Sequence, residues 1–149
     1  MTTTLTKTSV KVAESRSIWA PKAVIQVFHC FNAINSFPEM ENDDYEVRSL
    51  KLPCSSMTRE VSLLRAFEAG ADAVVVLVCP EGACDYLEGN TRARKRVERV
   101  KKILDEIGIG GKRLNIYNMP RHDVAEAQNI IQQTIFDLEI IGRNPAALI

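Results

Sequence analysis

A chain of 149 residues fits a single domain. Hydrophobic residues make up 46% of it and charged residues 26%, as in ordinary soluble globular proteins. The 19 basic and 19 acidic residues cancel, so the charge gives no support for a protein whose main ligand is nucleic acid.

The N-terminal segment, residues 1–20, is polar and rich in serine and threonine. It lacks the apolar core of a signal peptide, and no stretch of the chain reaches the length of a membrane span. We therefore expect a cytoplasmic protein whose first 20 residues form a flexible or partner-bound arm. Trp19 lies near the end of this arm, and docking on a partner or folding back onto the chain's own domain are equally open for it.

Strands and helices are predicted to alternate along residues 21–149, the predicted domain. The runs typical of strands are 23–31, 45–53, 71–79 and 113–119. The runs with helical spacing of apolar residues are 57–70, 91–108 and 123–142. This order predicts a single three-layer α/β domain with a mostly parallel four-stranded sheet, of the flavodoxin or Rossmann type.

The sequence also predicts details of individual strands and helices. The alternation of polar and apolar residues in 45–53 indicates a strand near an edge, whereas 71–79 is apolar almost throughout and is typical of a strand covered on both faces. Gly89 and Asn90 are expected to precede and cap the helix 91–108. Val61 and Ile107 fall at helical spacing with the other apolar residues of 57–70 and 91–108.

The four cysteines all lie where predicted strands end. Cys30 is near the end of the first strand, Cys54 comes just after the second, Cys79 ends the third, and Cys84 lies in the loop after it. Ligands of parallel α/β sheets bind outside the carboxyl ends of the strands, so we expect all four thiols at one edge. Without an export signal, disulfides explain them poorly.

Four thiolates at one edge suit either an iron–sulfur cluster or zinc. Structural zinc sites usually use two short C-x2–4-C pairs, but here a single C-x4-C pair accompanies two cysteines that are 24 residues apart. The spacing therefore favours iron–sulfur over zinc. Buried inert thiols and a redox pair of Cys79 and Cys84 are further alternatives, although C-x4-C lacks the C-x-x-C spacing of thioredoxin-like motifs.

Two histidines and a basic run lie near these elements. His29 adjoins Cys30, but neighbours on a strand face opposite ways, so a packed or hydrogen-bonding histidine is favoured over a metal ligand. His122 lies in the loop before the last helix. The basic residues of 92–102 are interpreted as a solvated helix face in preference to a docking surface for an acidic partner.

The segment CPEGACDYLEGNTRARKRVERVKKILDEIGI resembles the most distinctive stretch of the methyl-viologen-reducing hydrogenase delta subunit family. That stretch is a C-x-x-G-x-C-x-Y-x-x-G-N segment followed by a basic amphipathic helix. AFEAGADAVVVLVC resembles the family's lead-in, while PCSS and FHCFNA fall where the family has a Cys-Ser-Gly segment and a first-strand cysteine cluster. The resemblance covers about residues 23–118 and is specific in 66–108.

The resemblance implies a small electron-transfer subunit of anaerobic metabolism that holds one [2Fe-2S] cluster. Such subunits pass electrons between a donor oxidoreductase, often a hydrogenase or formate dehydrogenase, and a heterodisulfide-reductase-A-like flavoprotein. Carried over by position, Cys30, Cys54, Cys79 and Cys84 are the expected ligands. The first segment departs from the family, which usually has more than one cysteine there.

Overall fold

The computed structural model of the protein describes residues 22–30, 33–34, 45–52, 58–79 and 89–145. The predicted N-terminal arm with Trp19, and the cysteines Cys54 and Cys84, lie outside these residues. The division into an arm and a domain therefore stays a prediction.

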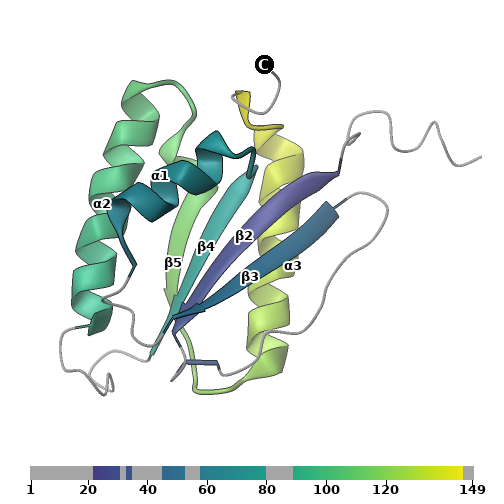
Figure 1. Ribbon diagram of the computed structural model, residues 1–149. Helices are drawn as coiled ribbons and strands as arrows, with labels where there is room; N and C mark the ends of the chain where they lie inside the picture. Colours follow the sequence, from purple (N-terminus) through teal and green to yellow (C-terminus); the bar gives the residue numbers. More distant parts are fainter. Residues whose placement is uncertain (1–21, 31–32, 35–44, 53–57, 80–88, 146–149) are drawn as a thin grey trace, which may run out of the picture.

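The described strands form one sheet in which every neighbouring pair is parallel (Figure 1). They are β2 (Ala23–Cys30), β3 (Tyr45–Leu52), β4 (Ala73–Val78) and β5 (Leu114–Asn118). Their order in the sheet is β3-β2-β4-β5. The predicted parallel α/β sheet is thus confirmed, and so is the edge position of the second strand.

The helices cover both faces of the sheet, which makes the three layers that were predicted (Figure 1). They are α1 (Glu60–Glu68), α2 (Gly89–Glu106) and α3 (Val124–Ile141), with a short 3-10 turn, η3 (Gly111–Arg113), before β5. α1 and α2 pack on one face and α3 on the other. No helix in the described part of the chain is both long and apolar enough to cross a membrane.

The structure defines both ends of α3 and the start of α2. Asp123 caps α3, because its side chain accepts a hydrogen bond of 3.0 Å from the backbone N–H of Glu126. Gly142 ends the same helix with φ at +91°, a backbone conformation that favours glycine. The prediction for α2 was wrong: the helix already begins at Gly89, so Gly89 and Asn90 form its first turn and do not precede it.

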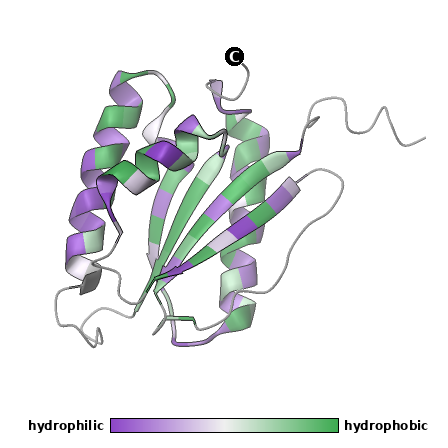
Figure 2. Ribbon diagram, viewed as in Figure 1, coloured by the Kyte–Doolittle hydropathy of each residue, from purple (hydrophilic) through white to green (hydrophobic). Residues whose placement is uncertain are grey.

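The central strand β4 supplies both halves of the core. Every residue of β4 is buried, as the continuous apolar run predicted. Side chains alternate across a strand, so Val75 and Leu77 pack toward α3, whereas Val74 and Val76 pack toward α1 and α2. Figure 2 shows the corresponding apolar band through the middle of the sheet.

Two residues at the apolar helical positions of the sequence are largely exposed. Val61 is 48% exposed and Ile107 59% exposed. Only Leu63 and Phe67 of α1 are buried, and Ile107 comes just after the last residue of α2. Both side chains line an open groove of about 420 Å³ between α1 and α2.

Asp72 organises the amino end of the sheet, just before β4. Its carboxylate is fully buried and accepts hydrogen bonds from the backbone N–H groups of Val24 and Asn144, each at 2.9 Å. It also accepts one from Nε of Arg143 at 3.0 Å. This carboxylate therefore ties β2 and the segment after α3 to the start of β4.

Arg113 and Asn144 complete this polar cluster. Arg113 is buried, and burial lowers the pKa of its guanidinium while the nearby charge of Asp72 opposes that shift. Its guanidinium donates to four backbone carbonyls, those of Asp72, Ile109, Gly142 and Arg143. The amide of Asn144 donates to the carbonyls of Phe67 and Ala71. The amino end is thus held by side chains that satisfy buried backbone groups.

Candidate functional site

The strand order places a topological switch point between β2 and β4. From β2 the chain goes to β3 on one side, and the later strands β4 and β5 lie on the other side. In open parallel sheets, ligands bind outside the carboxyl ends of the strands at such a point. Cys30 is the last residue of β2, and Cys79 directly follows Val78, the last residue of β4.

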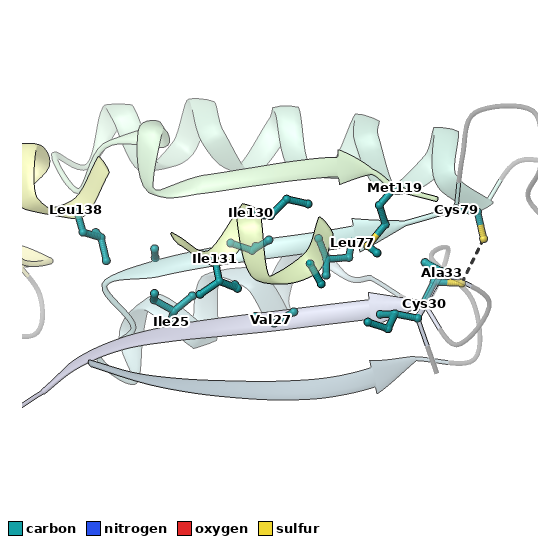
Figure 3. Close-up of a cluster of buried hydrophobic side chains, with 14 residues drawn as sticks. Ile25, Val27, Cys30, Ala33, Leu77, Cys79, Met119, Ile130, Ile131 and Leu138 are labelled. Carbon is teal, nitrogen blue, oxygen red and sulfur yellow. Dashed lines mark hydrogen bonds between the residues drawn. The ribbon is translucent and has the colours of Figure 1, made fainter. Parts of the chain in front are cut away.

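The two thiols at this point face each other (Figure 3). Their sulfur atoms are 3.8 Å apart, both residues are buried, and neither is in a disulfide. A disulfide needs sulfur atoms about 2.05 Å apart. Two thiolates on one tetrahedral metal atom, with metal–sulfur bonds of about 2.3 Å, lie about 3.8 Å apart. The observed spacing fits two ligands of one metal atom, and it also fits a hydrogen bond between two thiols.

Backbone hydrogen bonds fix the turn that follows Cys30. The carbonyl of Cys30 accepts from the N–H groups of Ala33 at 2.9 Å and Ile34 at 3.0 Å. The carbonyl of Ala33 in turn accepts from the N–H of His122 at 2.6 Å. The loop before α3 thus holds the Cys30 turn in place, although nothing in the sequence linked His122 to this cysteine.

His29 has the packing and hydrogen-bonding role that was predicted for it. It is buried, and its Nδ1 lies 2.9 Å from the carbonyl oxygen of Ile34. A carbonyl can only accept, so Nδ1 carries the proton in this hydrogen bond. Burial lowers the pKa of His29, the hydrogen bond to Ile34 opposes that shift, and the nearby charge of Lys51 adds to it. The ring therefore supports the Cys30 turn in its neutral form.

Asn118 and Arg94 support Cys79 from the other side. Nδ2 of Asn118 donates to the carbonyl of Cys79 at 2.7 Å, and the guanidinium of Arg94 donates to Oδ1 of Asn118. Asn118 was not singled out from the sequence, and Arg94 belongs to the basic run that was interpreted as a solvated helix face. Asn118 carried a usable signal, because it is a polar residue at the end of the fourth strand, at the same edge as the thiols.

The other two predicted ligands are placed only by the sequence. Cys54 comes two residues after Leu52, and Leu52 is the register partner of Cys30 on β3. Cys84 comes five residues after Cys79. Among the residues that the structure describes, no group of three or more His, Cys, Asp or Glu side chains is close enough to hold a metal ion. Two of the four predicted ligands are thus brought together, and the other two lie outside the described ranges.

Known proteins with similar sequences bear on this site. The vhu iron-sulfur subunit of F420-non-reducing hydrogenase from Methanocaldococcus jannaschii is 37% identical over 99 residues, which cover 66% of this chain and 74% of that protein. The protein of the same name in Methanococcus maripaludis is 36% identical over the same shares of both chains.

A second kind of relative is much longer than this chain. The A component of the ferredoxin/F(420)H(2)-dependent CoB-CoM heterodisulfide reductase of Methanosarcina acetivorans is 32% identical over 96 residues, which cover 64% of this chain but 12% of that protein.

The family model of the methyl-viologen-reducing hydrogenase, delta subunit, matches residues 31–142. As the C-x-x-G-x-C-x-Y-x-x-G-N segment predicted, the chain belongs to the methyl-viologen-reducing hydrogenase delta subunit family.

Proposed function

We propose that this chain is an electron-transfer subunit that holds one [2Fe-2S] cluster through Cys30, Cys54, Cys79 and Cys84. The observation that carries the proposal is the pair of buried thiols 3.8 Å apart at the switch point of the sheet. Iron–sulfur subunits among the relatives support the choice of cofactor. When bound, such a cluster supplies a site that accepts and releases one electron at a time.

The length of the chain allows the other two cysteines to join this pair. Two residues span at most about 7 Å, so Cys54 stays within reach of the end of β3, which lies beside Cys30. Five residues span at most about 18 Å, which gives Cys84 ample reach from Cys79. We assign Cys30 and Cys79 to one iron atom because their separation already fits that role.

The proposed partners are a donor oxidoreductase, such as a hydrogenase or formate dehydrogenase, and a heterodisulfide-reductase-A-like flavoprotein. The first is supported by relatives that are hydrogenase subunits. The second is supported by the heterodisulfide reductase A components that contain a matching segment within their own chains. The experiment for this part is to identify the proteins that co-purify with the tagged chain from anaerobic cells.

Anaerobic purification of the full chain tests the cofactor. We expect a brown protein with about two irons and two inorganic sulfides, which becomes paramagnetic on reduction, as expected for a [2Fe-2S] cluster. A colourless protein with one bound zinc would instead favour a zinc-stabilised scaffold, whose tetrahedral site the sulfur spacing fits equally well. A metal-free protein with an activity that depends on Cys79 and Cys84 alone would favour a thiol-redox protein.

Single substitutions then test the ligands. Each of Cys30→Ala, Cys54→Ala, Cys79→Ala and Cys84→Ala should lose the cluster, because four thiolates leave none to spare. Arg92→Ala, an exposed change on α2, is the control and should keep its iron and sulfide. A full cluster in Cys30→Ala would overturn the ligand assignment.

A further inference from the structure

We infer that Arg94 and Asn118 are positioning residues for the Cys79 side of the site, and that through them the charge of Arg94 raises the reduction potential of the bound cluster. This inference rests on the proposed function. The residues form a chain of two hydrogen bonds, from the guanidinium of Arg94 to the amide of Asn118 and on to the carbonyl of Cys79.

The sheet explains why Cys79 needs such a support. The ladder between β4 and β5 pairs Val78 with Asn118, and both strands end there. The carbonyl of Cys79 is therefore the first one beyond the paired part of β4, and Cys79 is buried. Buried carbonyls need a donor, and the side chain of Asn118 supplies it at 2.7 Å.

An asparagine suits the middle position because it must accept on one side and donate on the other. A guanidinium only donates, and a carbonyl only accepts. The Asn118 amide satisfies both with its oxygen and nitrogen, and the two contacts fix which way it points. Aspartate would set a carboxylate oxygen against the carbonyl of Cys79, and alanine would leave both neighbours without this partner.

The positive charge of Arg94 should also affect reduction of the bound cluster. Arg94 is on the exposed side of α2 and always positive, and one side chain separates it from the backbone of Cys79. A cluster gains negative charge when it accepts an electron, so a nearby positive charge favours the reduced form. Because Arg94 is exposed, salt should weaken this effect.

The test compares midpoint potentials of the anaerobically purified full chain and its variants, followed by electron paramagnetic resonance at low salt. Arg94→Gln should lower the equilibrium constant for reduction of the cluster three- to tenfold. For a one-electron couple, this corresponds to a decrease of the midpoint potential by about 28 to 59 mV. Arg94→Lys keeps the charge and should recover more than half of that shift. Lys95→Gln removes the same charge at the next exposed position of α2 and should shift the potential by less than half as much.

Non-additivity tests the chain of contacts itself. If Arg94 acts through Asn118, the double variant Arg94→Gln/Asn118→Ala should shift the potential by less than the sum of the single variants. Equal shifts for Arg94→Gln and Lys95→Gln, or an additive double variant, would overturn the inference and leave the cluster assignment intact. The iron and sulfide content of each variant is measured alongside.

Metal-free protein provides a readout that does not depend on the cluster. Diamide, a thiol oxidant, takes two electrons and two protons from Cys30 and Cys79 as it joins them in a disulfide, which peptide mass spectrometry quantifies. Asn118→Ala should change the rate of this reaction at least threefold relative to Lys95→Gln, because it removes a hydrogen bond to the backbone carbonyl of Cys79. Equal rates would overturn the positioning role, even if the wild-type chain proved to hold no iron.

Discussion

At the amino end of the sheet, the buried carboxylate of Asp72 accepts three hydrogen bonds from groups of this same chain. At the carboxyl end, the buried thiols of Cys30 and Cys79 are hydrogen-bonded to each other, and the backbone carbonyls of these two residues accept hydrogen bonds from Ala33, Ile34 and Asn118. One end therefore uses its polar side chains to close the fold, whereas the other uses them to hold two reactive atoms in position. We expect substitutions at the amino end to change stability, and substitutions at the carboxyl end to change cofactor chemistry.

The largest effect on stability is expected at Asp72. Asp72→Ala leaves the N–H groups of Val24 and Asn144 and the guanidinium of Arg143 without this partner, so we expect a loss of about 3 to 5 kcal/mol. Chemical denaturation followed by circular dichroism measures it. Arg48→Ala, which breaks an exposed ion pair with Glu46, is the control and should cost less than about 1 kcal/mol.

If Asp72→Ala does not fold, Asp72→Asn allows the same comparison. It keeps the shape and one acceptor oxygen but removes the charge. A similar loss in Asp72→Asn and Arg48→Ala would contradict the view that the amino end holds the fold together.

A smaller loss of stability is expected when one of the two buried thiols is removed. In metal-free protein, Cys79→Ala removes one buried sulfur from a core that otherwise remains packed, so we expect a loss of about 1 kcal/mol. The same substitution should abolish cluster binding. A loss in metal-free Cys79→Ala as large as that in Asp72→Ala would mean that the carboxyl end also holds the fold together, and the contrast between the ends would fail.

The features that depend on local pattern were predictable from the sequence. The continuous apolar run of β4 indicated a strand buried on both faces, and the alternating order of strands and helices put Cys30 and Cys79 at one edge of the sheet. These predictions succeeded because the side-chain period and the direction of parallel strands follow from the order of the elements alone.

Contacts that depend on register could not be predicted in this way. Asn118 reaches Cys79 because β5 pairs with β4 in one particular register, and Arg94 reaches Asn118 because of how α2 lies on the sheet. Exposure of Val61 and Ile107 has a similar origin, since helical spacing identifies an apolar face but not how much of it a neighbouring helix covers.

Alkaline pH should have a weaker effect on stability than the substitutions above, through Tyr117 on β5. Burial raises the pKa of Tyr117 above its ordinary value of 10.0, and the nearby charge of Asp137 adds to the shift. The unfolded chain therefore loses this proton first, so the stabilising contribution is present below about pH 10 and falls as pH rises through and above that value. Denaturation midpoints between pH 8 and 11 should fall less steeply in Tyr117→Phe than in the wild type.

Asp137→Asn provides the matched control for that slope. It removes the charge but leaves the burial of Tyr117, so its pH dependence should lie between those of the wild type and Tyr117→Phe. Identical slopes in all three proteins would show that Tyr117 ionises equally easily in the folded and unfolded chain.

The only stabilising effect is expected at Thr58, which lies two residues before the start of α1. In the described part of the chain its buried hydroxyl has no hydrogen-bond partner, although its carbonyl accepts from Arg96 at 3.0 Å. Thr58→Val replaces this hydroxyl by a methyl group of similar size, so metal-free protein should become more stable by about 1 kcal/mol.

Thr134 on α3 is the counterpart, because its buried hydroxyl donates to the carbonyl of Ile130 at 2.9 Å. Thr134→Val loses that hydrogen bond and should cost about 0.5 to 1.5 kcal/mol. If the Thr58 hydroxyl makes no hydrogen bond, the midpoints of urea denaturation should shift in opposite directions in Thr58→Val and Thr134→Val. A loss of stability in both would show that the Thr58 hydroxyl forms a hydrogen bond in solution, and the prediction for Thr58 would then fail.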